Sequence, residues 1–459
     1  MHRRDAATEE LTRAIVRYAV ERLSLDPPPL DHARAEGELR AHAGNTIAPA
    51  GIGGMEALRI FRQVLAPACI SVDHPRVLSF VPAAPTEAAV LFDLVVGASG
   101  IYGGSWLEGS GAVFAENEAL RWIAGLAGLP ASAGGVFVSG GTAGNLSALI
   151  AARFRWRDRA SGRHDRTRGL MVASGGAHSS VAQAARAMDA DVVTVPADPE
   201  GRLHKHALAA TVAGLDPEDR DRVFALIATA GTTNAGVIDD LAGVADVADG
   251  LGTWFHVDGA YGGAALAAPS VRPLFDGVER ADSFIVDPHK WLFGPFDSCA
   301  LLYRDPAVAR AAHTQKAAYL DVLHSGEARG APDWNPSDYA HHLSRRARGL
   351  PLWFSLATHG TDAYTEAIET TLATTRAGAE LIRGAPHLEL ILEPELSVLL
   401  FRRVGWSSEQ YQAWSDRMLA DGVAFVVPTT WDDESVLRLC IVNPETTEDD
   451  LRLIVDSLA

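Results

Sequence analysis

Cysteine is scarce in this chain. Its 459 residues include three cysteines, Cys69, Cys299 and Cys440, and no CxxC pair. Such an odd and scattered set provides neither a disulfide framework nor a zinc site. We interpret all three as small buried hydrophobic residues and expect no metal centre.

Long apolar runs and a net positive charge are also lacking. No apolar run approaches the length of a transmembrane helix, and residues 1–6 lead into a polar helical pattern, unlike a signal peptide. The 40 basic and 58 acidic residues give a formal net charge of −18, which repels nucleic acid and anionic membranes. We therefore expect a cytoplasmic protein that binds neither nucleic acid nor a membrane.

The length of the chain predicts more than one domain. Apolar residues spaced by four predict a helix over 10–25, and a second helix is expected over 54–65, both within an N-terminal helical arm, residues 1–84. Residues 85–350 alternate short apolar runs with helical stretches and are expected to form a large α/β domain. Residues 351–459 are expected to form a small C-terminal α+β domain.

The large domain is expected to have a doubly wound α/β fold. Its apolar runs are nearly continuous, which is typical of strands that are covered on both faces. In such a fold, ligands bind outside the carboxyl ends of the strands. The predicted strands are 135–138, 169–172, 191–195, 223–228, 253–257, 283–286 and 299–303.

The smaller domain mixes helices and strands. A long helix is expected over 352–383, and Thr447 is expected to cap a final helix over 448–458. Before this domain, segment 325–332 is the best candidate for a mobile loop. The other predicted elements are strands over 388–392, 397–401, 423–427 and 436–441 and a helix over 408–420.

An acid and a lysine follow two of the predicted strands. Lys290 lies in VDPHKW (residues 286–291), and Asp258 lies in HVDGAY (residues 256–261). Pyridoxal phosphate enzymes need such a pair, because the lysine forms a Schiff base with the cofactor aldehyde and the acid keeps the pyridine nitrogen protonated. A buried salt bridge is the poorer explanation, since a buried ion pair is a doubtful source of stability.

Residues 139–145 (SGGTAGN) connect the strand over 135–138 to a helix. The glycines let the backbone approach a ligand, the helix N-terminus suits a phosphate, and Thr142 adds a hydroxyl. A plain turn is the alternative for this segment taken alone. It contains neither the GK[ST] of a P-loop nor GxGxxG, which makes a nicotinamide dehydrogenase the least favoured class.

His178 and segment 230–234 (AGTTN) occupy corresponding positions after two further strands. Taken alone, His178 is more simply a surface or capping residue, and the threonines cap the backbone of a loop. Five strand ends, however, carry a glycine-rich loop, a histidine, a Gly-Thr-Thr loop, an aspartate and a lysine. Because such ends converge on one crevice, a single cofactor site explains them better than five coincidences.

These motifs resemble the pyridoxal-phosphate group II decarboxylases, the family of the aromatic amino acid, histidine and glutamate decarboxylases. Matching stretches run from about His74 to Arg348 and continue more weakly to Arg438, and the resemblance is greatest to the aromatic branch. It implies a type I pyridoxal-phosphate fold, like that of aspartate aminotransferase, with a mostly parallel seven-stranded sheet and helices on both faces. It also implies a homodimer with its active sites at the subunit interface and the N-terminal arm packed on the partner subunit.

The resemblance also implies roles for individual residues. Lys290 would carry the cofactor, Asp258 would pair with its pyridinium nitrogen, and His178 would stack on the ring and orient the substrate carboxylate. The other implied cofactor contacts are Gly141, Thr142 and His289 at the phosphate, with Asp287 beside them, and Thr233 and Ala260 along the ring.

Tyr319 lies 29 residues after Lys290, the separation at which the aromatic decarboxylases carry a loop tyrosine that reaches the neighbouring subunit's site. The resemblance therefore implies that Tyr319 protonates the substrate Cα. Arg345 matches a family arginine near the active site, although a solvated arginine explains it equally well.

Three departures from the family pattern concern the substrate. Asp287 stands where animal relatives carry asparagine. Phe80, Pro82 and Trp106, the expected substrate contacts besides Arg345, lie in segments that are less aromatic than those of the animal enzymes. Residues 107–116 also depart from the usual sequence of the family. These differences leave the cofactor chemistry intact.

We expect decarboxylation of an L-amino acid to its amine and CO2. An aromatic substrate is preferred over an aliphatic diamino acid or an acidic amino acid. The alternatives are aldehyde-forming oxidative deamination or transamination on the same cofactor, and a non-catalytic regulatory homologue. Tyr319 favours decarboxylation, since relatives with phenylalanine there form aldehydes, and intact Lys290, Asp258 and His178 disfavour the regulatory homologue.

Overall fold

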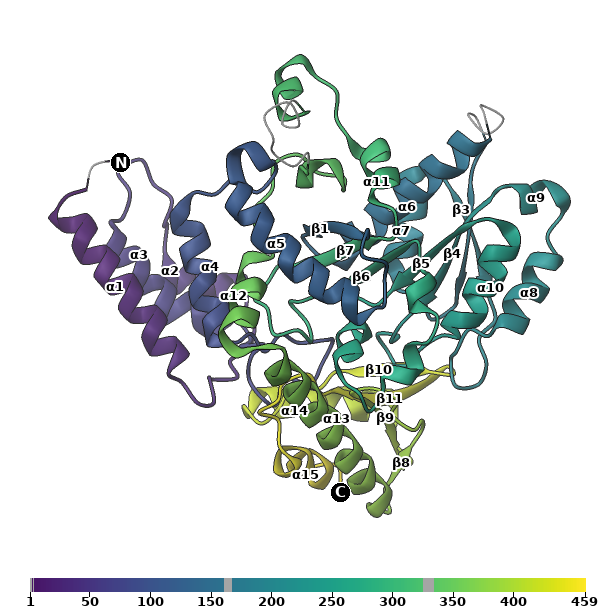
Figure 1. Ribbon diagram of the computed structural model, residues 1–459. Helices are drawn as coiled ribbons and strands as arrows, with labels where there is room; N and C mark the ends of the chain where they lie inside the picture. Colours follow the sequence, from purple (N-terminus) through teal and green to yellow (C-terminus); the bar gives the residue numbers. More distant parts are fainter. Residues whose placement is uncertain (1, 3, 161–166, 325–333) are drawn as a thin grey trace.

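The computed structural model describes residue 2 and residues 4–160, 167–324 and 334–459 (Figure 1). A central sheet flanked by helices forms the body of the molecule, with the N-terminal helices at one side and a second sheet near the C-terminus below it. The predicted mobile loop, 325–332, lies outside the described residues.

Seven strands form the central sheet in the order β1-β7-β6-β5-β4-β2-β3. β7 is antiparallel to both of its neighbours, and the remaining pairs are parallel. Every strand except β7 therefore runs the same way, and their carboxyl ends meet at one edge. This confirms the predicted mostly parallel sheet. The strands are β1 (Gly134–Val138), β2 (Leu170–Ser174), β3 (Asp191–Val195), β4 (Val223–Thr229), β5 (Trp254–Asp258), β6 (Ser283–Val286) and β7 (Cys299–Tyr303).

Alternating side chains of the strands pack into two separate cores. In β6, Phe284 and Val286 belong to one core, and Ile285 belongs to the other. This alternation explains the continuous apolar runs, because both faces of the sheet are covered. The helices over the first core include α5 (Trp106–Leu126), α8 (Lys205–Ala213) and α10 (Leu241–Leu251), and those over the second are α6 (Gly141–Arg159), α7 (Ser179–Met188) and α11 (Pro306–His313).

The C-terminal module contains a four-stranded antiparallel sheet in the order β10-β11-β9-β8. Thr447 caps its last helix, as predicted. The predicted helix over 352–383 is broken by Gly360, whose positive φ of 79° ends one helix and begins the next. The elements are α12 (Leu350–His359), α13 (Thr361–Gly384), β8 (Leu388–Leu390), β9 (Val398–Arg403), α14 (Ser408–Ala420), β10 (Pro428–Trp431), β11 (Glu434–Cys440) and α15 (Glu448–Asp456).

The predicted strand over 423–427 is wrong. Ala424 and Val426 are buried, but the backbone there pairs with a segment of the N-terminal arm, and β10 begins only at Pro428. Phe425 forms an isolated bridge with Val77 and exchanges backbone hydrogen bonds with Arg76 and Leu78. Part of the predicted arm thus lies against the C-terminal module, while the division into 1–84, 85–350 and 351–459 stays a prediction.

The N-terminal helices leave much apolar surface exposed. None of the residues of α1 is buried, and Cys69 is exposed too, contrary to its predicted burial, because this part of the chain packs loosely on the rest. Cys299 and Cys440 are buried, as predicted. The helices of this part are α1 (Ala6–Leu23), α2 (Glu36–Ala43), α3 (Gly54–Ile60), the π-helix η1 (Phe61–Leu65), the 3-10 helix η2 (Ala66–Ala68) and α4 (Glu87–Ser99).

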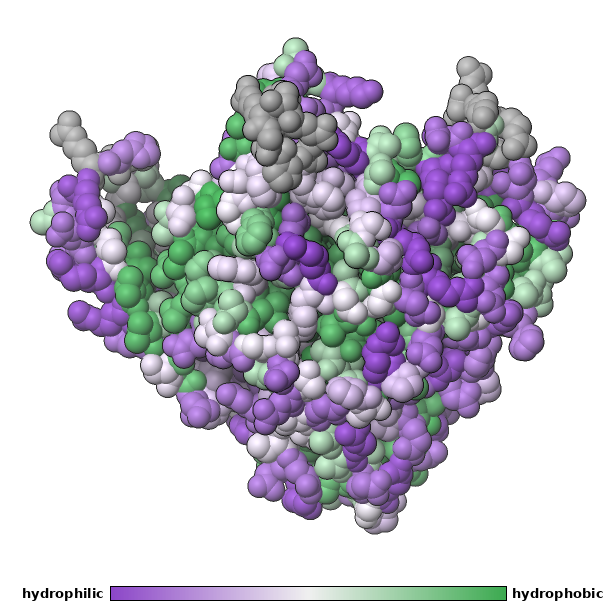
Figure 2. Space-filling view, in the orientation of Figure 1, coloured by the Kyte–Doolittle hydropathy of each residue, from purple (hydrophilic) through white to green (hydrophobic). Residues whose placement is uncertain are grey.

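Hydrophobic residues gather over α4 and α5 on the face shown in Figure 2. We call the exposed residues of three helices the apolar face. They are Ile15, Val16 and Val20 of α1, Leu91, Leu94 and Val95 of α4, and Leu107 and Phe114 of α5. No helix in the described part of the chain is both long enough and apolar enough to cross a membrane. The remaining short helices are α9 (Pro217–Asp221), η3 (Gly262–Ala267), η4 (Arg272–Phe275), η5 (Val278–Arg280), η6 (Ala318–His324) and η8 (Pro336–Asp338).

Candidate active site

A cavity of about 380 Å³ opens at the carboxyl edge of the central sheet. Its wall is built from residues that follow five different strands, as the order of the motifs predicts. The structure brings together nine predicted residues there: Gly141, Thr142, His178, Thr233, Asp258, Ala260, Asp287, His289 and Lys290.

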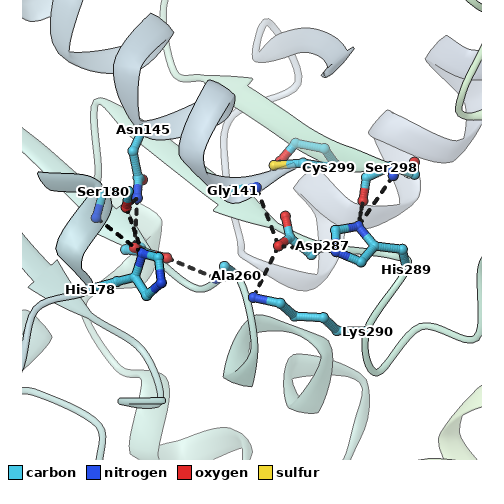
Figure 3. Close-up of polar contacts among 12 residues, drawn as sticks. Gly141, Asn145, His178, Ser180, Ala260, Asp287, His289, Lys290, Ser298 and Cys299 are labelled. Atoms are coloured by element: carbon cyan, nitrogen blue, oxygen red, sulfur yellow. Dashed lines mark hydrogen bonds and ion pairs between the residues drawn. The ribbon is translucent and has the colours of Figure 1, made fainter. Parts of the chain in front are cut away.

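Lys290 lies just after β6 and points to a buried carboxylate (Figure 3). Its Nζ lies 3.1 Å from Asp287 Oδ2, which also accepts a hydrogen bond of 3.3 Å from the backbone N–H of Gly141. Burial alone would lower the pKa of the Lys290 amine, but the carboxylates of Asp287 and Asp258 outweigh burial and raise it. The two acids thus favour the protonated form of the Lys290 side chain.

Asp258 ends β5 and is only 4% exposed. Its Oδ2 accepts a hydrogen bond of 2.7 Å from Asn145 Nδ2, and its Oδ1 accepts one of 3.0 Å from the backbone N–H of Ala260. Both bonds stabilise the ionised carboxylate, which is the form needed opposite a protonated ring nitrogen.

His178 is the N-cap of α7 and also lines the cavity. It therefore caps a helix, as its simpler interpretation has it, and also lies where a site residue is expected. Its Nδ1 accepts the backbone N–H of Ser180 at 3.2 Å and lies 2.8 Å from the Ser180 hydroxyl. Because Nδ1 accepts, the neutral ring carries its proton on Nε2.

The start of α6 fits the phosphate of a pyridoxal cofactor. Helix α6 begins at Gly141 without a side-chain cap, so its first N–H groups and its positive dipole end face the cavity. A Cβ on Gly141 would lie 3.1 Å from the Cβ of Ala260, so the glycine keeps this approach open. His289 Nδ1 is held 2.6 Å from the backbone oxygen of Ser298. Among the described residues, the Thr229 hydroxyl in the wall is buried with no hydrogen-bond partner, as expected of a site for a polar ligand.

The sequence profile of the pyridoxal-dependent decarboxylase conserved domain matches residues 56–404. The chain belongs to the pyridoxal-dependent decarboxylase family.

Relatives of this decarboxylase include two bacterial enzymes. An L-2,4-diaminobutyrate decarboxylase of Rhizobium meliloti (strain 1021) is 33% identical over 396 residues, which cover 84% of this chain and 78% of the relative. An aromatic-L-amino-acid decarboxylase of Bacillus atrophaeus is 29% identical over 397 residues, which cover 84% and 80%. The predicted family, carboxy-lyase class and pyridoxal phosphate cofactor are confirmed, and the decarboxylase acts on an amino acid.

The fold of the decarboxylase is shared with a solved plant structure. The Oryza sativa TDC with PLP and tryptamine superposes with a TM-score of 0.90, at 24% identity, over 100% of this chain and 98% of the other. This likeness confirms the predicted type I fold.

The predicted substrate contacts of the decarboxylase do not line the described cavity. Phe80 is 67% exposed, Pro82 is buried, and Trp106 begins α5 outside the cavity wall. Tyr319, in η6, is 71% exposed and also lies outside the wall. The structure therefore gathers the cofactor side of the site but not the expected substrate side.

Arg345 forms a buried ion pair instead of facing the described cavity. Its guanidinium bonds both oxygens of Glu116, at 2.6 and 2.8 Å, and donates to the backbone oxygen of Gly103 at 2.6 Å. Gly349 donates its N–H to the same carboxylate. At 7% exposure, Arg345 is not the solvated residue of the alternative interpretation, and its functional role stays a prediction.

Several further residues of the site had no predicted role, among them Asn145, Ser180, Thr229, Tyr261, Phe296 and Asp297. The glycine-rich pattern predicts a connecting segment over residues 139–145, but α6 already begins at Gly141. The spacing of four between Gly141 and Asn145 places both on one helix face, and this was the available signal. Phe296 and Asp297 carry no comparable local pattern.

Proposed function

We propose that this decarboxylase converts an aromatic L-amino acid to its amine and CO2 as a homodimer, with Tyr319 of one subunit donating the proton that replaces CO2 on the substrate Cα in the partner's site. The observation that carries the proposal is the convergence of Lys290, Asp258 and His178 on one cavity. A regulatory homologue would have no need of this arrangement.

When bound, pyridoxal phosphate supplies an aldehyde for the substrate amine and a protonated ring that accepts the electron pair left by CO2. Lys290 holds the aldehyde end, and its amine returns there when the product leaves. Asp258 keeps the proton on the ring nitrogen, because its ionised carboxylate is fixed by two hydrogen bonds. His178 presents Nε2–H to the substrate carboxylate.

Tyr319 is the proposed proton donor for the Cα atom. Its exposure of 71% in a single chain agrees with a side chain that completes a neighbouring subunit's site. The apolar face supports the dimer, since monomeric proteins rarely leave so many large apolar side chains in contact with water.

The described wall favours an aromatic over an acidic substrate. It contains Phe296 and Tyr261, and none of its described residues is an arginine that could pair with an acidic side chain. A second candidate is an aliphatic diamino acid, because the Asp297 carboxylate also lies in the wall and one relative acts on L-2,4-diaminobutyrate.

A substrate panel tests the proposal. Purified enzyme loaded with the cofactor is incubated with phenylalanine, tyrosine, tryptophan, L-2,4-diaminobutyrate and glutamate, and CO2 and amine are measured. Turnover of an aromatic substrate is expected to exceed the others. Preference for the diamino acid would support the second candidate, aldehyde with ammonia would support oxidative deamination, and no turnover with any amino acid would support the regulatory homologue.

A further inference from the structure

Behind the cavity, five buried side chains and the exposed His178 form an unbroken series of hydrogen bonds. Trp254, His256 and Asp258 alternate along β5 and therefore share one face of the strand. His256 lies opposite Ser283 in the pairing of β5 with β6. In order, the series contains Trp254, Ser283, His256, Asn145, Ser180 and His178, and Asp258 branches from Asn145.

The orientation of the Asn145 amide is fixed by its neighbours. An ionised carboxylate only accepts, so Asn145 must turn its Nδ2 to Asp258, at 2.7 Å. The second Nδ2 hydrogen goes to the Ser180 hydroxyl at 2.8 Å. The amide oxygen is left to face His256 Nε2 at 2.8 Å, and His256 must donate to it.

His256 is a neutral donor in this series. Complete burial lowers the pKa of its imidazole to about 4, so near neutral pH the ring carries one proton, on Nε2. Its Nδ1 then accepts the Ser283 hydroxyl at 2.8 Å, and the Ser283 oxygen accepts Trp254 Nε1–H at 2.7 Å. The far end is anchored by Arg155, whose guanidinium lies 4.3 Å from the Trp254 ring centre.

At the end of this hydrogen-bonded series that is nearest the cavity, Ser180 determines which ring nitrogen of His178 carries the proton. Ser180 accepts from Asn145, so its own hydroxyl hydrogen is free to point to His178 Nδ1 at 2.8 Å. The ring is then held from behind with Nε2–H directed away from Ser180. The titratable groups that share the cavity wall with His178 are Asp258, Tyr261, Asp287, His289, Lys290 and Asp297.

We infer that Asn145, itself held by His256, is a positioning residue that couples Asp258 to His178. One amide fixes the acid that holds the ring proton and, through Ser180, the imidazole that meets the substrate. The inference rests on the proposed placement of the cofactor between Asp258 and His178. Its consequence is that a single side chain behind the site adjusts both cofactor binding and substrate turnover.

Two variants separate the effect of Asn145 on Asp258 from its effect on His178. Asn145→Ala removes a hydrogen bond to a charged group, so cofactor affinity is expected to fall about tenfold to a hundredfold, with a changed absorbance spectrum of the bound cofactor. Ser180→Ala leaves the bonds of Asp258 intact, so affinity and spectrum are expected to stay unchanged while kcat falls about tenfold. The matched control is Ser147→Ala, a buried serine on α6 outside the cavity wall, which should alter neither.

Folding is checked by circular dichroism, and a second measurement is independent of turnover. Ring-¹⁵N-labelled histidine, assigned with His178→Asn, should show a pyridine-like Nδ1 and a protonated Nε2 for the neutral ring of residue 178. A neutral ring protonated on Nδ1, or an Asn145→Ala enzyme with wild-type cofactor affinity and spectrum, would overturn the coupling. If Asp258→Asn also left the spectrum unchanged, the placement of the cofactor itself would be at fault.

Discussion

The cofactor side and the substrate side of this decarboxylase differ sharply in how far one chain completes them. On the cofactor side, Asp258 is 4% exposed and Asp258, His178 and Lys290 each have named hydrogen-bond or ion-pair partners. On the substrate side, Tyr319 is 71% exposed and contributes nothing to the cavity of its own chain. Under the proposed function, one folded chain builds the cofactor site by itself but needs a second chain for catalysis.

The largest effect is expected on the cofactor side. Lys290→Ala removes the only amine in the cavity wall as described, so the bound chromophore and all turnover should be lost. The bound chromophore is measured by absorbance of the purified protein, and turnover is measured by amine formation. The control is Lys205→Ala, whose exposed ion pair with Asp246 lies outside the cavity, and this variant should retain both. Normal turnover by the Lys290 variant would remove its assignment.

The next effect concerns the substrate side. General acid catalysis contributes roughly 10²–10⁴-fold, and Tyr319→Phe should slow amine formation by about that factor. The bound chromophore should remain, because Tyr319 lies outside the cavity wall. Products are quantified by mass spectrometry, with aldehyde measured alongside amine. Unchanged amine formation would show that Tyr319 is not the donor.

The apolar face provides a smaller test of the same comparison. Leu94→Asp places a charge in the proposed interface and should weaken the dimer about tenfold to a hundredfold. Activity should fall with dilution while the chromophore persists, as measured by sedimentation and by assays at several protein concentrations. Leu453→Asp replaces an exposed leucine of α15 and should leave the dimer intact. An active monomer would contradict the proposed interface.

The smallest expected effect tests the acid beside the cofactor. Asp287→Asn removes a carboxylate that raises the pKa of Lys290, so the pKa should fall and the neutral amine should persist to lower pH. Cofactor loading, followed by absorbance after mixing, should therefore extend to lower pH. Loss of one negative charge beside the phosphate should also tighten binding by up to about tenfold.

The control for this prediction lies in the same wall. Asp297→Asn removes a charge that pairs with Arg348, not with Lys290, and should leave the pH range of loading unchanged. A loading profile that is identical for wild type and Asp287→Asn would show that Asp287 does not govern the Lys290 amine.

Sequence patterns predicted the central sheet and the gathering of nine residues around one cavity. Local composition suffices there, because each strand is a continuous apolar run and each functional residue follows a strand. Residues 423–427 show where this fails: their backbone pairs with residues 76–78 and forms no strand of the sheet, and no local pattern distinguishes the two. Asn145 was missed because its partners, His256 and Ser180, come from other elements.

The substrate side could not be predicted in the same way. Arginine is usually a surface residue, yet Arg345 is buried in an ion pair with Glu116, which lies far away in the sequence. The partners of Tyr319 are expected on a second chain, about which the spacing of residues in one chain carries no information. The resemblance to a family supplied those expectations, and they remain to be tested.

The central claim, that one chain prepares the cofactor and its partner delivers the proton, is tested most directly by mixing two inactive variants. Lys290→Ala chains are co-expressed with Tyr319→Phe chains, and amine formation is measured on the purified mixture. A hybrid dimer would contain one intact site, and random pairing should restore about a quarter of wild-type activity. A mixture no more active than the separate variants would contradict the claim.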